Sequence, residues 1–223
     1  MKSFTGRLIF RPLAIVILLL AVFLLGCAQP PEGSAERYIQ IAYDASNRGH
    51  YTKAIENYTL AIGVNPKLVS AYVNRAAAYA ALEEYDKTIT DCDKAIELEP
   101  DTPLAYINRA YALNQLSRFD EAVADSSKAI ELDKSIAEAY IGRAHAYNGL
   151  GKLNLAIADA NKALEINPKL AQPYYLRGLA NKGLGKKAEA IADFEKFIGL
   201  TSNPLLSEKA LWEIKQLKNG FST

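Results

Sequence analysis

Cysteine and histidine are scarce in this chain, which has two of each among 223 residues. Two cysteines, Cys27 and Cys92, do not make a disulfide framework. His50 and His145 do not combine with a cysteine or a glutamate at the spacing of metal ligands. The sequence therefore predicts neither a disulfide-stabilised fold nor a metal site.

Other signals of catalysis or nucleic-acid binding are also missing. Gly183-Leu184-Gly185-Lys186 lacks the spacing of a phosphate-binding loop and the Ser or Thr that would follow it. No basic block stands out, so nucleic acid is not an expected partner. We predict that the protein is not an enzyme, that it has no catalytic residues, and that it uses no cofactor and no small-molecule substrate.

What the sequence does contain is a period of 34 residues, which marks a chain built by stacking one supersecondary unit. Tyrosine recurs at this interval, and arginine, aspartate and alanine each form a further column in phase with it. The columns are Tyr38, Tyr72, Tyr106, Tyr140 and Tyr174; Arg75, Arg109, Arg143 and Arg177; Asp91, Asp125, Asp159 and Asp193; and Ala61, Ala95, Ala129 and Ala163. Stacked repeats leave a long continuous surface free, which favours a binding role.

The spacing of apolar residues predicts two helices in each unit. In the second unit one apolar face recurs at intervals of four and three, and a second face follows after a break at 82–84. These faces are Tyr72, Ala76 and Tyr79, then Tyr85, Thr88, Cys92 and Ala95. Pro100 ends the second helix because proline lacks the N–H that would continue it. No stretch alternates with the period of a half-buried strand, so the domain is predicted to be all-α.

The second unit resembles the tetratricopeptide repeat. The resemblance lies in Tyr-Val-Asn-Arg-Ala-Ala-Ala-Tyr at 72–79, followed by Tyr85, Ala95 and Pro100. It implies a right-handed α-solenoid of about five helix-turn-helix units, at 35–68, 69–102, 103–136, 137–170 and 171–204. An amphipathic segment at 205–223 is expected to be a helix that caps the open end of the stack.

The arginine and aspartate columns are predicted to meet as ion pairs between the two helices of a unit. Both columns are missing together from the first unit, which has Ile41 and Asn57 instead. The predicted structural pairs are Arg75–Asp91, Arg109–Asp125, Arg143–Asp159 and Arg177–Asp193. Cys92 lies on the apolar face of its helix and is expected to be a small core residue.

The resemblance places partner binding on the concave surface lined by the first helices. The candidate groove residues that it implies are Tyr43, Asn74, Asn108, Tyr111, Asn114, His145, Asn148 and Tyr175. An amide can donate to and accept from a peptide backbone, and a tyrosine offers an amphipathic anchor. Lys182 is the main cation expected in the groove. The expected partner is an extended or helical protein segment of mixed polar and apolar character.

The first 27 residues differ from the repeats. Three basic residues precede an unbroken apolar run at 13–25, which is shorter than the roughly 20 residues of a membrane span but typical of a signal-peptide core. Leu24-Leu25-Gly26-Cys27 resembles the lipobox of bacterial lipoproteins. This implies a signal peptide at 1–26, lipidation of Cys27, and a proline-rich linker at 27–34 that holds the repeats near a membrane. The alternative is an uncleaved signal anchor.

These features together predict a lipid-anchored, extracytoplasmic adaptor that binds another envelope protein. Such an adaptor would serve pilus, secretion or cell-wall machinery, by analogy of fold alone. Two alternatives stay open: a structural lipoprotein that associates with itself, and an accessory lipoprotein that binds cell-wall polymer. Exposed sugar-binding aromatic residues in the groove would favour the polymer-binding alternative.

Overall fold

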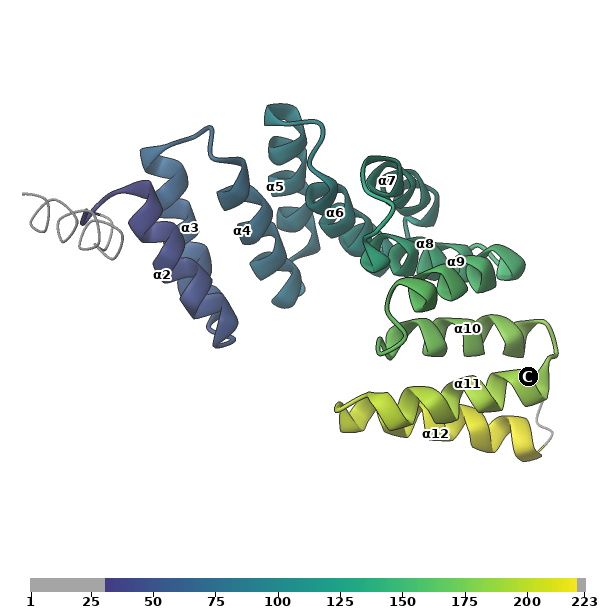
Figure 1. Ribbon diagram of the computed structural model, residues 1–223. Helices are drawn as coiled ribbons and strands as arrows, with labels where there is room; N and C mark the ends of the chain where they lie inside the picture. Colours follow the sequence, from purple (N-terminus) through teal and green to yellow (C-terminus); the bar gives the residue numbers. More distant parts are fainter. Residues whose placement is uncertain (1–30, 220–223) are drawn as a thin grey trace, which may run out of the picture.

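The structure, a computed structural model, describes residues 31–219, which form eleven α-helices and no strand. The predicted all-α solenoid of helix-turn-helix units is confirmed (Figure 1). The predicted signal peptide and Cys27 lie outside the described residues. None of the helices within 31–219 has the length and apolar character needed to cross a membrane.

The helices alternate with short turns along the whole array. The first helices of the five units are α2 (Ala35–Asn47), α4 (Val69–Ala81), α6 (Pro103–Gln115), α8 (Ala137–Gly149) and α10 (Gln172–Gly183). The second helices are α3 (Tyr51–Val64), α5 (Tyr85–Leu98), α7 (Phe119–Leu132), α9 (Leu153–Ile166) and α11 (Lys187–Leu200). The last helix, α12 (Pro204–Asn219), begins after Asn203, whose Oδ1 accepts from the N–H groups of Leu205 and Leu206.

The turn between the two helices of each unit contains one residue with positive φ, in the left-handed region of backbone conformation. Gly49, Gly151 and Gly185 supply it in three units, where the lack of a Cβ makes positive φ favourable. The equivalent residues of the second and third units are Glu83 (φ 61°) and Ser117 (φ 59°). Only these two described non-glycine residues have positive φ, and a side chain there carries a conformational cost.

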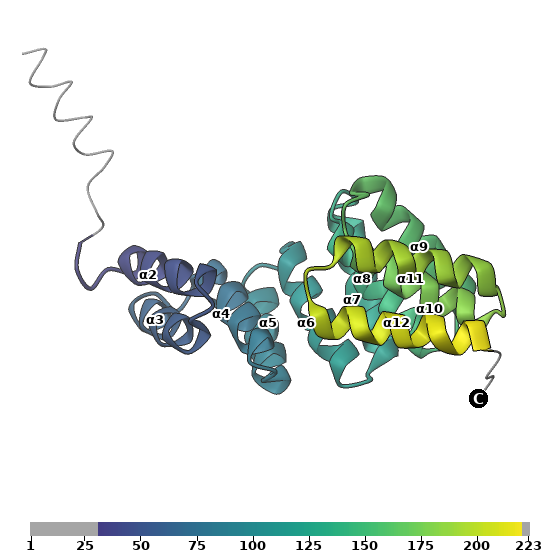
Figure 2. The same ribbon diagram turned by 90° about the horizontal axis from the view of Figure 1, so that it is seen from below.

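The array bends so that the first helices lie on its inner side. Each of α2, α4, α6 and α8 contacts the next first helix, and each second helix packs between its own first helix and that of the next unit. The helix pairs therefore follow one another along a curved, extended path from α2 to α12 (Figures 1 and 2). The inner surface is continuous and is formed by the first helices.

Small residues form the contacts between the helices. The alanine column Ala61, Ala95, Ala129 and Ala163 is fully buried, and Phe197 occupies the equivalent place in the fifth unit. The tyrosine column joins consecutive units. The hydroxyl of Tyr72 donates to the carbonyl oxygen of Pro66 at 3.2 Å, and Tyr106 donates to Pro100 at 3.0 Å. Tyr174 repeats this bond in the fifth unit.

The C-terminal helix α12 occupies the place of a sixth first helix. It packs on α11 as α10 packs on α9, and Ala210 and Ile214 join a core with Phe194 and Phe197. No second helix follows it among the described residues. Leu205, Leu211 and Trp212 of this helix are exposed.

Candidate binding groove

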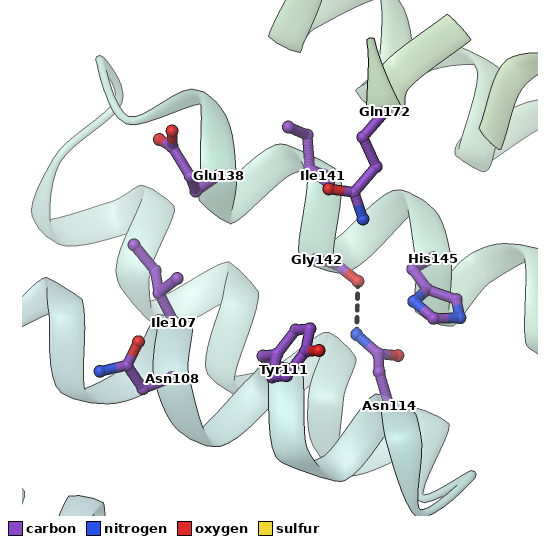
Figure 3. Close-up of a pocket in the computed structure, with 9 residues that line it drawn as sticks. All are labelled: Ile107, Asn108, Tyr111, Asn114, Glu138, Ile141, Gly142, His145 and Gln172. Atoms are coloured by element: carbon purple, nitrogen blue, oxygen red, sulfur yellow. Dashed lines mark hydrogen bonds between the residues drawn. The ribbon is translucent and has the colours of Figure 1, made fainter. Parts of the chain in front are cut away.

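A cleft opens on the inner surface between α6, α8 and α10. Its volume is about 180 Å³, below the roughly 300–1,000 Å³ of sites for drug-sized ligands, so it is matched to a single side chain. Figure 3 shows the residues that line it. They are Ile107, Asn108, Tyr111 and Asn114 from α6, Glu138, Ile141, Gly142 and His145 from α8, and Gln172 from α10.

Two of the candidate asparagines connect neighbouring first helices. The Nδ2 group of Asn114 donates to the carbonyl oxygen of Gly142 at 2.8 Å, and that of Asn148 donates to Leu176 at 2.9 Å. Both Oδ1 atoms are buried and have no hydrogen-bond partner. Asn114 is only 4 % exposed. The Nδ2 group of each amide thus donates within the solenoid, while the Oδ1 atom accepts no hydrogen bond.

The predicted neighbours Asn74 and Asn108 are both half-buried on the inner surface. Asn108 reaches back to α4, where its Nδ2 donates to the carbonyl oxygen of Val73 at 3.1 Å. No hydrogen bond of the Asn74 side chain occurs among residues 31–219. The two amides therefore differ, because Asn108 has one donor already engaged and Asn74 does not.

Two of the predicted tyrosines are exposed to solvent. Tyr111 lines the cleft with 43 % of its surface exposed and meets the edge of Tyr85 at a centroid distance of 6.3 Å. Tyr43 is 54 % exposed on α2 and does not line this cleft. Tyr111 is thus the aromatic side chain that the cleft presents to a ligand.

His145 lies half-buried at the cleft wall. Burial, and to a lesser extent the charge of Lys209, lowers the pKa of His145 below its ordinary value. The imidazole is consequently neutral at pH 7, with one nitrogen able to donate and the other able to accept.

The helix α12 contacts two groups that were expected to face the groove. Tyr175 packs its ring against Phe197 and Phe194, at centroid distances of 5.0 and 5.6 Å, and its hydroxyl is buried. Lys182 donates to the buried carboxylate of Glu213 at 2.7 Å. The ring of Tyr175 is itself only half-buried, and the ammonium group of Lys209 on α12 lies 5.8 Å from its centroid. Its place in the groove stays a prediction.

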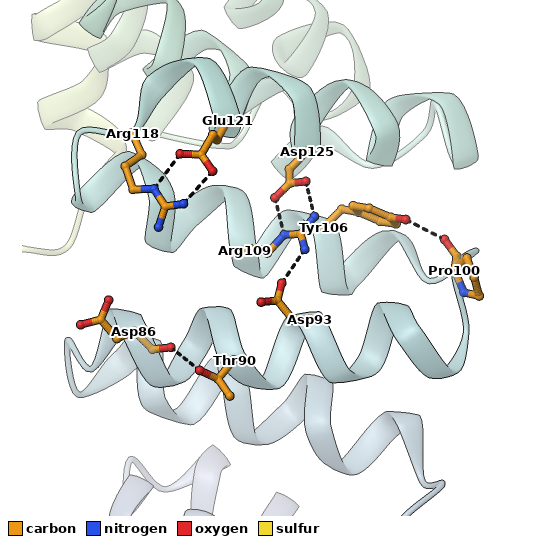
Figure 4. Close-up of polar contacts among 9 residues, drawn as sticks. All are labelled: Asp86, Thr90, Asp93, Pro100, Tyr106, Arg109, Arg118, Glu121 and Asp125. Atoms are coloured by element: carbon orange, nitrogen blue, oxygen red, sulfur yellow. Dashed lines mark hydrogen bonds and ion pairs between the residues drawn. The ribbon is translucent and has the colours of Figure 1, made fainter.

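The structure brings all four predicted Arg–Asp pairs together. Arg109 donates from Nε and Nη2 to the two oxygens of Asp125, both at 2.7 Å (Figure 4). Arg75–Asp91 and Arg143–Asp159 repeat this two-bond geometry, with distances of 2.7 to 2.9 Å, and Arg177 likewise contacts both oxygens of Asp193. These aspartates are buried and hold the two helices of each unit together.

Each arginine also makes a contact that the sequence reasoning missed. The Nη1 group of Arg109 donates to Asp93 on the second helix of the preceding unit at 2.6 Å. The other arginines reach the equivalent residues Thr59, Ser127 and Asn161. These four acceptors are also spaced 34 residues apart, so the recurrence of a polar residue at this position could have indicated the contact. Each guanidinium further lies over the ring of the tyrosine three residues before it.

Cys92 is fully buried in the core, as expected from its place in the helix. Burial raises the pKa of its thiol to about 12, so the reactive thiolate is absent at neutral pH. No group of three or more His, Cys, Asp or Glu side chains within 31–219 is arranged to hold a metal ion.

Family models of the tetratricopeptide repeat match four of the five helix pairs. One matches residues 69–102 and 137–170, and another matches 104–136 and 171–204, which together exceed half of the chain. The chain belongs to the tetratricopeptide repeat family. The pair α2–α3 precedes the matched residues and packs on α4 in the same manner. No curated protein sequence matches the chain.

Solved structures of tetratricopeptide repeat proteins share the fold. A MamA protein is 22 % identical with a TM-score of 0.62, over 85 % of this chain and 97 % of MamA. The protein TTC0263 of Thermus thermophilus is 16 % identical with a TM-score of 0.68, over 83 % and 99 %. YrrB, described as having an unusual peptide-binding site, is 20 % identical with a TM-score of 0.60, over 81 % and 93 %. This is a protein-interaction fold whose concave surface is available for binding.

Proposed function

We propose that this tetratricopeptide repeat chain is a lipid-anchored, extracytoplasmic adaptor whose inner surface binds a peptide segment of another envelope protein. The observation that carries the proposal is the cleft between α6 and α8, sized for one side chain and flanked by a continuous surface. Binding by the inner surface is how solenoids of this kind use their curvature.

The chemistry of the groove fits a peptide. Tyr111 supplies an exposed aromatic contact, and Ile107 and Ile141 supply apolar walls. Asn114 supplies a hydrogen-bond acceptor that no group of the solenoid uses. A peptide has side chains that can pack on the aromatic ring and the apolar walls, and backbone N–H groups that can donate to the acceptor.

The anchoring part of the proposal is supported by the sequence of the first 27 residues. A cationic start, an apolar run and Leu24-Leu25-Gly26-Cys27 are the features of a lipoprotein signal. Stable anchoring requires more than one acyl chain, because each buried CH₂ contributes only about 0.8 kcal/mol. Lipoprotein modification of Cys27 would supply two or three chains on one residue.

Site-specific photocrosslinking in intact cells tests the binding surface. A photoreactive amino acid at Tyr111 should capture an envelope protein, because this side chain is exposed in the cleft. The same group at Leu60, which is 49 % exposed on the second helix α3, is the matched control. Failure to recover an envelope protein from Tyr111, or equal recovery from both positions, would contradict the proposed groove.

Membrane fractionation tests the anchor. Cys27→Ser should release the protein from membranes if a lipid on this sulfur holds it there. Tight retention of the Cys27→Ser protein, with no change in its mobility on a denaturing gel, would instead favour the uncleaved signal anchor.

A further inference from the structure

We propose that the cleft between α6 and α8 receives a basic side chain, Lys or Arg, from an extended peptide, and that this residue sets the specificity of the adaptor. The inference rests on the proposed peptide-binding function and adds the chemistry of the residue that is bound. Three features of the cleft carry it: uncompensated carboxylates, a buried acceptor without a partner, and an exposed aromatic ring.

The charge around the cleft is negative. Glu138 lines the cleft, is exposed, and forms no ion pair with any residue of 31–219. Glu83, in the turn between α4 and α5, likewise has no ion pair within that range. The charge of Glu83 adds to the effect of burial in raising the pKa of Tyr111, which places this carboxylate within electrostatic reach of the ring. No Lys or Arg lines the cleft.

A donor-rich group is also what the buried amide requires. Asn114 uses its nitrogen toward Gly142, and its Oδ1 atom has no partner although the residue is only 4 % exposed. In Figure 3 this oxygen points away from Gly142, toward the side on which His145 lies. A buried acceptor without a partner costs about 1–3 kcal/mol, so a ligand N–H that reaches it removes this cost. Ammonium and guanidinium groups carry only donors.

The ring of Tyr111 completes the site. A cation over an aromatic face gains about 0.5–2 kcal/mol, most when it is shielded from water. The pocket-lining isoleucines Ile107 and Ile141 can contact the aliphatic part of a Lys or Arg side chain. The charge of Lys209, which lies over the ring of Tyr175, acts on His145, at the opposite end of the cleft from Glu138 (Figure 3).

The backbone conformation of Glu83 provides a further test of the proposed binding of a basic side chain. Glu83 adopts the left-handed conformation that Gly49, Gly151 and Gly185 adopt in other units. A glutamate is strained there and glycine is not, so Glu83 lowers the stability of the fold at this position. Replacement by glycine should therefore stabilise the fold while removing a charge that attracts the ligand.

The experiment selects linear peptides from a random display library on the full-length chain in detergent micelles. Peptides whose binding is lost with Tyr111→Ala are kept, and their affinities are measured by fluorescence anisotropy. We expect a conserved Lys or Arg. Its replacement by norleucine should weaken binding about tenfold, and the effect should shrink at high salt.

Charge variants identify the position of the bound cation. Glu138→Gln should weaken the basic peptide about two- to fivefold, as expected for an exposed carboxylate, and leave the norleucine peptide unchanged. Glu83→Gly should weaken the basic peptide severalfold and raise the unfolding temperature. Glu56→Gln removes an exposed carboxylate from the second helix α3, and should leave every affinity unchanged.

Two results would overturn the inference. Selected peptides that carry Asp, Glu or an aliphatic residue at the conserved position, with affinities insensitive to Glu138→Gln, would refute the basic side chain while leaving the peptide-binding function intact. A library that yields no peptide sensitive to Tyr111→Ala would contradict the proposed function and this inference together.

Discussion

Arg109→Ala is the substitution whose effect on stability follows most directly from the structure. Arg109 holds three helices: it donates twice to Asp125 on α7 and once to Asp93 on α5. Its side chain is 23 % exposed, that of Asp125 is 9 % exposed, and that of Asp93 is 56 % exposed. The bonds to Asp125 are therefore shielded from water, whereas the bond to Asp93 is not.

These exposures set the expected magnitude. Breaking a fully buried pair by removing one partner costs about 3–5 kcal/mol, because the other charge stays buried without compensation. The partial exposure of Arg109 places the expected cost at the lower end of that range, about 3 kcal/mol. An exposed pair such as Arg109–Asp93 adds only about 0.2–1 kcal/mol. Because 1 kcal/mol shifts the melting temperature of a domain of this size by about 2–4 °C, we expect a decrease of roughly 6–12 °C.

The assay is thermal and urea unfolding followed by circular dichroism, on Arg109→Ala, Asp125→Ala and the double variant. The double variant should be less destabilised than the sum of the singles, because it leaves no unpaired buried charge. Arg118→Ala is the matched control. It breaks the exposed Arg118–Glu121 pair of the same unit and should change stability by less than about 1 kcal/mol. A midpoint of Arg109→Ala equal to wild type, or strictly additive variants, would refute the reasoning.

Further predictions concern close packing and pH. Gly178→Ala should destabilise by about 1–3 kcal/mol in urea unfolding, because its Cβ would lie 2.8 Å from Cε1 of the fully buried Phe194. Gly63→Ala meets nothing within 4 Å and should stabilise by up to about 1 kcal/mol. The lowered pKa of His145 means that the unfolded chain, with its histidine pKa near 6.5, binds the proton first as the pH falls. Stability should therefore be unaffected by His145 above about pH 7 and decline below about pH 6.5 until the folded pKa is reached; His145→Gln should remove this decline and His50→Gln should not.

The fold could be predicted because the repeat aligns every unit with the next. The paired loss at Ile41 and Asn57 was enough to indicate that the arginine and aspartate columns meet. The period could not show how far each side chain reaches. Arg109 contacts Asp93 across a unit boundary, and Asn114 reaches forward while Asn108 reaches back, although all three reaching side chains lie on one helix.

The end of the groove was harder to predict than its middle. The segment at 205–223 is predicted to be an amphipathic capping helix, but its sequence alone does not show which groove residues it contacts. Tyr175 lies in the same column as Ile107 and Ile141, and the structure adds a contact of its ring with Lys209 of α12 that the column could not indicate. The left-handed conformation of Glu83 was equally hard to predict. It is recognised by comparison with Gly49, Gly151 and Gly185, which have positive φ at the equivalent positions.

The third contact of each arginine gives the stack a direction. Every arginine donates to its own unit and to the unit before it, and the first unit, which has no predecessor among the described residues, has Ile41 in that place. A chain made from its N-terminus onward therefore always presents the acceptor, such as Asp93, before the arginine that needs it. Each new helix pair can dock on a finished template, so assembly can follow synthesis one unit at a time.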